Sequence, residues 1–240
     1  MALILNLDQI AYLRATRRYN EPDPVQSAVV AELNGATGVA IQYRRDKKYI
    51  KDRDLFMLKG SVKNRLVVEM PPADDAIDKA VEIKPTTVIF SADHADSDSP
   101  MSTLEPGDSH ADFSSIINRL AGMGIGTGFF IEAEPAHAKT AAKLGANAVL
   151  INCSGYTEAK TLDEARNELD RIDKTAETAQ KNNLETYAGR GLNYHNLKPL
   201  AELGNIDYFM IGHAVCARAL MIGFPAAIAE LNSIIRTARI

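Results

Sequence analysis

The segment LETYAGRGLNYHNLKPLAELGNIDYFMIGHAVCARALMIG, residues 184–223, contains the pattern on which the predicted fold rests. Two short apolar runs, 184–189 and 206–212, flank a stretch of helical period at 196–204. Short apolar runs bounded by turn residues predict buried strands, and a helix between two of them predicts a parallel pair joined by a crossover. We therefore predict a strand–helix–strand unit here, followed by a short helix that ends before Gly223.

The same alternation extends along the whole chain. Strands are predicted at 2–8, 38–43, 65–70, 86–91, 126–132, 147–153, 184–189 and 206–212. Helices are predicted at 24–34, 52–62, 73–84, 111–123, 135–145, 162–182, 196–204 and 224–238. Eight such units in about 250 residues predict an α/β fold, the (β/α)8 TIM barrel. The alternative, an open doubly wound sheet, usually has fewer strands and a glycine-rich first turn, and no GxGxxG motif follows the first strand. Without a linker rich in Gly or Ser, residues 1–240 are predicted to form a single domain.

Composition excludes several classes of protein. Hydrophobic residues make up 46% of the chain and charged residues 24%, which is the usual globular mixture and excludes wholesale disorder. The net charge of −4 lacks the basic footprint of a general nucleic-acid binder. The longest apolar runs have strand length, well short of the ~18 residues of a membrane span. The first residues lack the features of a signal peptide, and Cys153 and Cys216 are isolated, so we expect a cytoplasmic protein with buried, reduced cysteines.

Polar side chains end almost every predicted strand. They are Asn6, Asp8, Gln9, Gln42, Arg44, Glu69, Ser91, Asp93, Glu132, Asn152, Arg190 and His213. The C-terminal ends of barrel strands carry the active site, although strands also become polar wherever they emerge into solvent. Emergence explains Glu69 less well, because LVV precedes it and MPP follows it. We therefore predict that Glu69 is a buried carboxylate and a candidate general base.

The turns after the last two strands predict a phosphate site. AGRGL at 188–192 and IGHA at 211–214 both place glycine beside a polar side chain, and a short helix follows the second. In many barrels the loops after strands seven and eight bind phosphate together with the N-terminus of such a helix. Arg190 and His213 could add charge-assisted hydrogen bonds. The alternative is that these glycines only permit tight turns.

Two connections are longer than a plain barrel needs. Residues 9–23 join the first strand to its helix, and residues 92–110 are polar and rich in turn residues. We predict that 93–110 form a mobile lid, because they bury little apolar area. His94, Asp96 and Asp98 match no metal-ligand spacing, so neither a metal nor a cofactor is expected.

Five stretches resemble the pyridoxine 5′-phosphate synthase family, in matching order along nearly the whole chain. They are NLDQIAYLRATRRYNEPDPV (6–25), YRRDKKYIKDRD (43–54), VEM (68–70), AGRGLNYHN (188–196) and IGHAVCARALMIG (211–223). The resemblance implies a (β/α)8 barrel with extra helices and a homo-oligomer, a dimer or an octamer built from dimers. It implies an enzyme of vitamin B6 biosynthesis that condenses 1-deoxy-D-xylulose 5-phosphate with 3-amino-1-hydroxyacetone 1-phosphate. It also implies that the loop after strand four closes over the site.

The resemblance also implies roles for residues. The amino-ketone phosphate would be held by Asn6, Arg17, Gly191, Gly212 and His213. The deoxyxylulose phosphate would be held by Asp8, Arg44 and Thr103. Gln9 and Tyr49, where the family has histidines, are further candidate substrate-binding residues. Glu69 would be the catalytic glutamate.

The chain departs from the family at the proton-transferring groups. Gln42 and Arg190 stand where the family has the histidines that accept and donate protons, Asn152 replaces a further histidine, and Leu150 replaces a glutamate. Glutamine takes up no proton near neutral pH and arginine releases none. We therefore keep two alternatives beside the synthase. One is a diverged paralogue that acts on a different phosphorylated ketone or amino-ketone; the other is a non-catalytic protein that binds phosphorylated metabolites.

Overall fold

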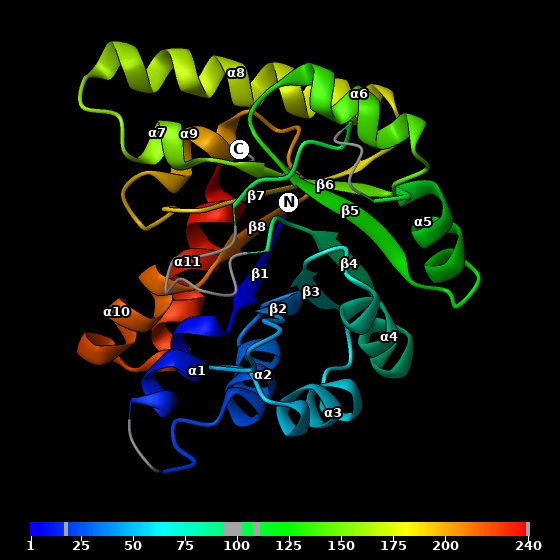
Figure 1. Cartoon of the computed structure of the whole chain (residues 1–240). Helices are drawn as coiled ribbons and strands as arrows, with labels where there is room; N and C mark the ends of the chain where they lie inside the picture. The colour runs from blue at the N-terminus through cyan, green and yellow to red at the C-terminus, as the bar shows by residue number, and fades with distance from the viewer. Residues whose placement is uncertain (17–18, 94–101, 108–110, 239–240) are drawn as a thin grey trace.

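The computed structural model describes residues 1–16, 19–93, 102–107 and 111–238. Within these ranges, eight parallel strands close into a barrel in the order of the sequence (Figure 1). They are β1 (Ala2–Asn6), β2 (Gly38–Gln42), β3 (Leu66–Met70), β4 (Thr87–Phe90), β5 (Gly126–Ile131), β6 (Ala148–Asn152), β7 (Glu185–Gly189) and β8 (Tyr208–Ile211). The closing pair is β1 with β8, in which Ala2 lies opposite Tyr208. The predicted TIM barrel is confirmed, and every predicted strand lies within about two residues of an observed one.

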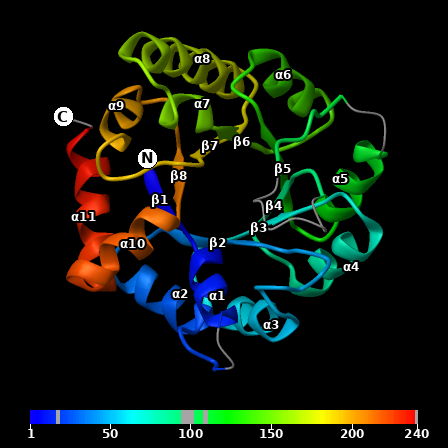
Figure 2. The same ribbon diagram turned by 60° about the vertical axis from the view of Figure 1, so that its left-hand side comes forward.

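Helices form a ring around the strands (Figure 2). They are α1 (Asp8–Ala15), α2 (Pro24–Leu33), α3 (Asp52–Ser61), α4 (Asp74–Ile83), α5 (Phe113–Ala121), α6 (Pro135–Lys143), α7 (Ser154–Thr157), α8 (Leu162–Lys181), α9 (Leu197–Glu202), α10 (His213–Ile222) and α11 (Phe224–Thr237). The eight predicted helices are all present, as is the short helix after strand eight. Two further helices were not predicted: α7, and α1, which occupies much of the expected 9–23 connection. Leu7 precedes α1 without a side-chain cap, so the usual start signal is missing.

Local signals account for several helix ends. Asp23 caps α2 by accepting a hydrogen bond from the Val25 amide, and Pro24 occupies the first turn. Gly35, Gly145 and Gly204 follow their helices with φ of +96°, +91° and +77°. These left-handed conformations end helices at little steric cost only for glycine.

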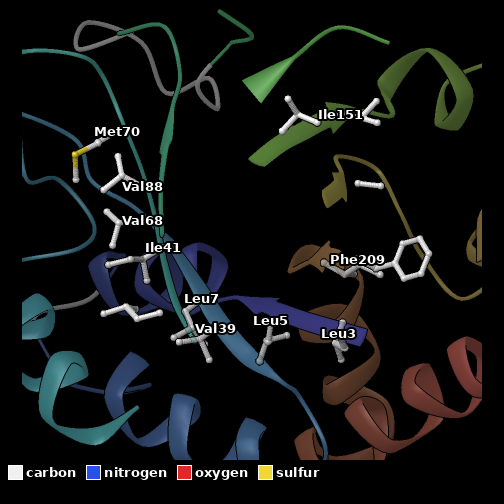
Figure 3. Close-up of a cluster of buried hydrophobic side chains, with 14 of the residues drawn as sticks. Leu3, Leu5, Leu7, Val39, Ile41, Val68, Met70, Val88, Ile151 and Phe209 are labelled. Atoms are coloured by element: carbon white, nitrogen blue, oxygen red, sulfur yellow. The ribbon is translucent and has the colours of Figure 1, made fainter. Parts of the chain in front are cut away.

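Two apolar clusters hold the barrel together. The larger lies between the sheet and the helices and includes Leu5, Ile41, Val68 and Phe209 (Figure 3). The smaller fills the barrel interior and includes Ile4, Ala40, Val67, Leu150 and Met210. Because both faces of each strand are buried, the strands are apolar almost throughout. Cys153 is buried in the larger cluster as predicted, whereas Cys216 is only partly buried.

The N-terminal end of the barrel is filled by a polar and aromatic group. Arg65 donates to Glu185 at 2.6 and 3.0 Å and to the Tyr187 hydroxyl at 2.5 Å. Its guanidinium lies 4.6 Å from the centre of the Tyr208 ring, which stacks on Tyr187. Charge, hydrogen bonds and aromatic surface therefore close this end beneath the interior cluster.

Candidate active site

A cavity of about 820 Å³ opens at the C-terminal ends of the strands. All of the predicted site residues except two line it: Asn6, Asp8, Gln9, Gln42, Arg44, Tyr49, Glu69, Arg190, Gly191, Gly212 and His213. They come from the ends of β1, β2, β3, β7 and β8 and from the segments that follow. The barrel thus assembles residues that are up to 207 positions apart, between Asn6 and His213.

The strand register explains why these side chains meet. Ile4, Ala40 and Val67 belong to the interior cluster. Side chains alternate along a strand, so the residues two positions later point to the same side. Those residues are Asn6, Gln42 and Glu69, and Gln42 lies opposite Glu69 in the pairing of β2 with β3. One polar layer therefore rests directly on the apolar interior.

Glu69 and Arg190 form an ion pair at the centre of this layer. A guanidinium nitrogen of Arg190 donates to Glu69 Oε2 at 2.7 Å, and the Glu69 side chain is 1% exposed, which confirms its predicted burial. The guanidinium also lies 4.6 Å from the centre of the Phe130 ring. Glu69 Oε1 and Gln42 Nε2 are buried and have no hydrogen-bond partner among the described residues. Buried polar atoms of this kind normally have partners, so an unmatched acceptor and an unmatched donor face the cavity.

Asp8 is held rigidly at the start of α1. Its Oδ1 accepts from the Gln42 amide at 2.7 Å and its Oδ2 accepts from Asn6 Nδ2 at 2.8 Å. The Asn6 side chain also accepts from the Asp8 amide, so the two residues form a closed pair. Burial, together with the negative charge of Glu69, raises the pKa of Asp8 from 3.8 to about 6.

The turns after β7 and β8 form the predicted phosphate corner. Arg190 and Gly191 have φ of +79° and +70°, and a Cβ on Gly191 would meet Thr157 Oγ1 at 2.1 Å. Gly212 precedes α10, and a Cβ there would meet the Asn6 carbonyl oxygen at 2.8 Å. His213 begins α10, whose N-terminal amides have no partner within the helix. Glycine is required at both turns, and an anion would meet free amides and the helix dipole.

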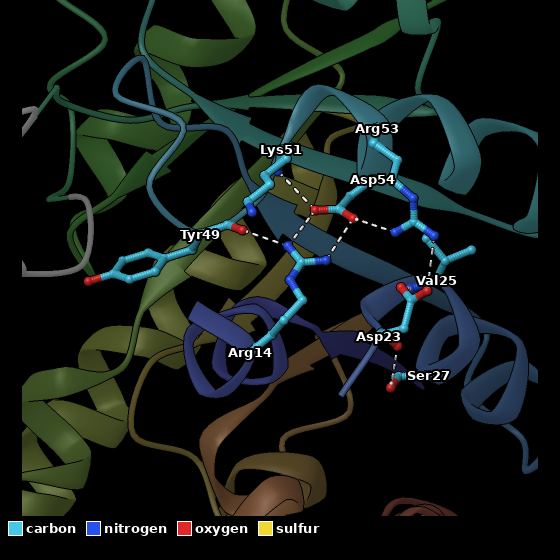
Figure 4. Close-up of polar contacts among 8 residues, drawn as sticks. All are labelled: Arg14, Asp23, Val25, Ser27, Tyr49, Lys51, Arg53 and Asp54. Carbon is cyan, nitrogen blue, oxygen red and sulfur yellow. Dashed lines mark hydrogen bonds and ion pairs between the residues drawn. The ribbon is translucent and has the colours of Figure 1, made fainter. Parts of the chain in front are cut away.

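Arg44 and Tyr49 form another wall of the cavity. Arg44 is 6% exposed, pairs with Asp46 at 2.7 Å and lies 5.7 Å from the centre of the Tyr49 ring. Arg14 and Asp54 support the segment that carries both (Figure 4). The two side chains make a buried bidentate pair with nitrogen–oxygen distances of 2.6 and 2.8 Å, and Arg14 also donates to the Tyr49 carbonyl oxygen at 2.8 Å.

Of the two remaining predicted site residues, only Thr103 is described, and it does not line the cavity. Arg17 lies outside the described residues. Thr103 donates to Glu132 Oε1 at 2.7 Å, and Asn152 donates to the same oxygen at 3.0 Å. Residues 94–101 and 108–110 of the expected lid, with His94, Asp96 and Asp98, lie outside the described ranges, so the lid stays a prediction.

Several cavity residues were missed, among them Tyr12, His195 and Arg218. Tyr12 packs on Tyr49 with ring centres 5.2 Å apart, and it reaches the cavity because α1 is a helix where a loop was expected. His195 lies in the AGRGLNYHN stretch, in the turn after β7, where its position was a usable signal. Arg218 lies on α10 and is paired with Glu230 at 2.9 Å.

The described residues hold neither a cluster of metal ligands nor a membrane-spanning helix. They contain no cluster of three or more His, Cys, Asp or Glu side chains placed to hold a metal ion. Among the described helices, none combines the length and the apolar character that crossing a bilayer demands.

Comparisons with known proteins agree with one another. Residues 3–237 match the family described as "Pyridoxal phosphate biosynthesis protein PdxJ". The chain is 34% identical over 236 residues to the pyridoxine 5′-phosphate synthase of Gloeothece citriformis (strain PCC 7424), covering 98% of each chain. It is 34% identical over 234 residues to that of Geobacter sp. (strain M21), again covering 98% of each.

A solved structure shares the fold. Thiamine phosphate pyrophosphorylase from Pyrococcus furiosus superposes with a TM-score of 0.62 at 16% identity, covering 98% of this chain and 95% of that one. At this identity the likeness concerns the barrel alone.

Proposed function

The chain belongs to the PdxJ family and is an enzyme of vitamin B6 biosynthesis, and the relatives it matches are pyridoxine 5′-phosphate synthases. From this we propose its substrates and the roles of its residues. The proposed reaction condenses 1-deoxy-D-xylulose 5-phosphate with 3-amino-1-hydroxyacetone 1-phosphate. Pyridoxine 5′-phosphate, inorganic phosphate and water are the products. The observation that carries this proposal is a single arrangement: the buried carboxylate of Glu69 lines the same cavity as Gly191 and Gly212, and Gly212 leads directly into α10.

The phosphate corner would hold the amino-ketone. Amides near Gly191 and Gly212 can approach phosphate oxygens closely, and His213 and Arg17 would add donors. Asn6 contacts Gly212 and Asp8, so it would connect this corner with the reacting groups. The unmatched Oε1 of Glu69 would accept a proton or a hydrogen bond from the bound amine.

The opposite wall would hold the deoxyxylulose phosphate. Arg44 supplies a guanidinium beside the Tyr49 ring, and binding a phosphate would require it to share its donors with Asp46. Gln9 and Asp8 extend this wall from α1. Thr103 would join it from the β4–α5 segment, which the Thr103–Glu132 hydrogen bond holds near β5.

The retained groups bind better than they transfer protons. Imine formation, loss of phosphate and water, and ring closure each need a group that gains or loses a proton near neutral pH. Gln42 offers a hydrogen-bond donor, its unmatched Nε2, that could orient a substrate oxygen, and Arg190 occupies one oxygen of Glu69. We therefore expect binding of the family substrates with slow turnover.

Rescue of a pyridoxine auxotroph, combined with a steady-state assay using both substrates, tests this function. Growth and product formation that disappear in Glu69→Gln would support it. A matched control is Glu134→Gln, which removes a partly exposed carboxylate just before α6 that does not line the cavity. Binding of both phosphates without detectable product would instead favour a non-catalytic binding protein.

A further inference from the structure

The centre of the active site holds more negative than positive charge. Asp8 and Glu69 both line the cavity, and Arg190 is the cation bound to Glu69. The other arginines that line it in the described chain are Arg44 and Arg218, which are paired with Asp46 and Glu230. The side chains of His195 and His213 are exposed at its rim. Two carboxylates therefore share one close guanidinium, an arrangement that favours one added proton.

The two carboxyl groups are fixed relative to each other. Asp8 accepts from the backbone amide of Gln42, and Gln42 is the register partner of Glu69 across the β2–β3 pair. Asn6 holds the second oxygen of Asp8, so the side chain cannot turn away from the cavity. Glu69 is 1% exposed and its Oε1 has no partner among the described residues, so it is open to a ligand or a proton on the cavity side.

Electrostatics places the added proton on Asp8. Burial and the charge of Glu69 raise the pKa of Asp8 to about 6, against the opposing effects of the Gln42 amide, Asn6 and Arg190. Arg190 binds Glu69 directly at 2.7 Å, whereas the hydrogen bonds of Asp8 come from the Gln42 amide and Asn6. A carboxyl group that changes protonation near neutral pH is suited to acid–base catalysis.

We propose that Asp8 and Glu69 form a carboxyl dyad that holds one exchangeable proton, and that Asp8 is the acid that delivers it to the substrate. The delivery step rests on the proposed function. Asp8 would then supply the proton transfer for which Gln42 and Arg190 have no suitable group.

The proton can be followed through imine formation. In the carbinolamine, the amine nitrogen lone pair forms the C=N bond as the C–O bond breaks and its electron pair moves to oxygen. The Asp8 proton goes to that oxygen, which leaves as water. The protonated imine then returns its N–H proton to the Asp8 carboxylate, so that the dyad regains its single proton.

Carbon-13 NMR of protein labelled at aspartate Cγ tests the dyad without any substrate. The Asp8 signal, identified by its absence in Asp8→Asn, should titrate with a midpoint near 6 in the natural protein. In Glu69→Gln the midpoint should move down towards the ordinary value of about 4. Glu185→Gln, which removes the same charge at the other end of the barrel, should leave it unchanged. The dyad would be overturned by an Asp8 midpoint near 4 in the natural protein, or by a midpoint that is the same in Glu69→Gln as in the natural protein.

Kinetics tests the delivery of the proton. The turnover number should fall as pH rises through about 6, and Asp8→Asn should lower it by at least about 100-fold and flatten that profile. Asp8→Glu should restore part of the turnover. If Asp8→Asn changes only the affinity for deoxyxylulose phosphate and not the turnover number, Asp8 is a binding residue and the delivery step is wrong. If the natural protein has no turnover but Asp8 titrates as expected, the dyad stands and the proposed function fails.

Discussion

Single side chains decide how fast this active site can work. The ion pair between Arg190 and Glu69, at 2.7 Å, joins a residue that releases no proton to the candidate base. Gln42, on the neighbouring strand, presents an amide where the resembling family has a histidine. We therefore expect the site to bind its substrates better than it transfers their protons.

Catalysis should respond to the reverse substitutions. We expect pyridoxine 5′-phosphate synthesis at a rate ~10²–10⁴-fold below that of relatives with both histidines, the usual loss for a positioned acid or base. The double variant Gln42→His with Arg190→His should recover part of it in a steady-state assay. A natural turnover number equal to that of such relatives would contradict this prediction. No recovery would mean that the surrounding residues have diverged as well.

Asp8 should make stability depend on pH in a defined direction. Below about pH 4 the group is protonated in both the folded and the unfolded chain, so it has no effect. Between pH 4 and 6 the unfolded chain ionises first, because the folded pKa is raised to about 6, and stability falls as pH rises. At pH 7 Asp8→Asn should therefore raise the free energy of unfolding by up to about 3 kcal/mol, and by little at pH 4. Denaturant melts at the two pH values measure this, and an equal effect at both would contradict it.

The residues of the site differ in how far the sequence predicts them. The burial of Glu69 follows from its apolar neighbours on both sides, and the glycine turns predict the phosphate corner. The clamp on Asp8 could not be predicted, because it depends on the Gln42 amide, 34 residues away. The orientation of the Arg190 side chain could not be predicted either, because its partner Glu69 lies 121 positions away in the sequence.

Among the helices and strands, α1 is the one whose sequence gives the weakest indication of its structure. Its apolar residues show no clear helical period, and it lacks a capping side chain, so a loop was expected. Its place is set by tertiary contacts, above all the pair of Arg14 with Asp54 of α3. Helices α2, α5 and α8, by contrast, begin at a capping side chain, Asp23, Asp112 and Thr161, and all three were predicted.

Breaking the Arg14–Asp54 pair should destabilise the protein strongly. Arg14→Ala removes the close partner of Asp54, which is 1% exposed and keeps only the long pair with Arg53, and such losses cost about 3–5 kcal/mol. Arg53→Ala is the matched control, because Arg53 is 56% exposed and its pairs with Asp23 and Asp54 are long, at 3.4 and 3.5 Å. It should cost less than about 1 kcal/mol. Chemical denaturation measures both, and similar losses would show that the pair has no special role.

At the scale of the whole molecule, the barrel couples ligand binding to stability. Strands β1, β7 and β8 carry the phosphate corner and also complete the ring. A ligand that binds only the folded chain stabilises all of it, by about 2.7 kcal/mol at a concentration 100 times its dissociation constant.

Inorganic phosphate should therefore raise the melting temperature of the protein. His213→Ala should reduce this rise, because His213 begins α10 at the predicted anion site. His195→Ala, another exposed histidine of the same cavity, should not reduce it. Thermal melts across a phosphate series decide the matter. A rise unaffected by His213→Ala, or reduced equally by His195→Ala, would place the anion elsewhere.

The filled N-terminal end of the barrel determines the order in which we expect substrates to enter the site and products to leave it. Arg65, Tyr187 and Tyr208 occupy one end, and the interior cluster lies directly above them. We therefore expect substrates to enter, and products to leave, at the opposite end, where the cavity opens. A molecule seated against the interior layer therefore arrives before its neighbour and departs after it. We expect water released during condensation to leave by the same opening, past any molecule that is still bound there.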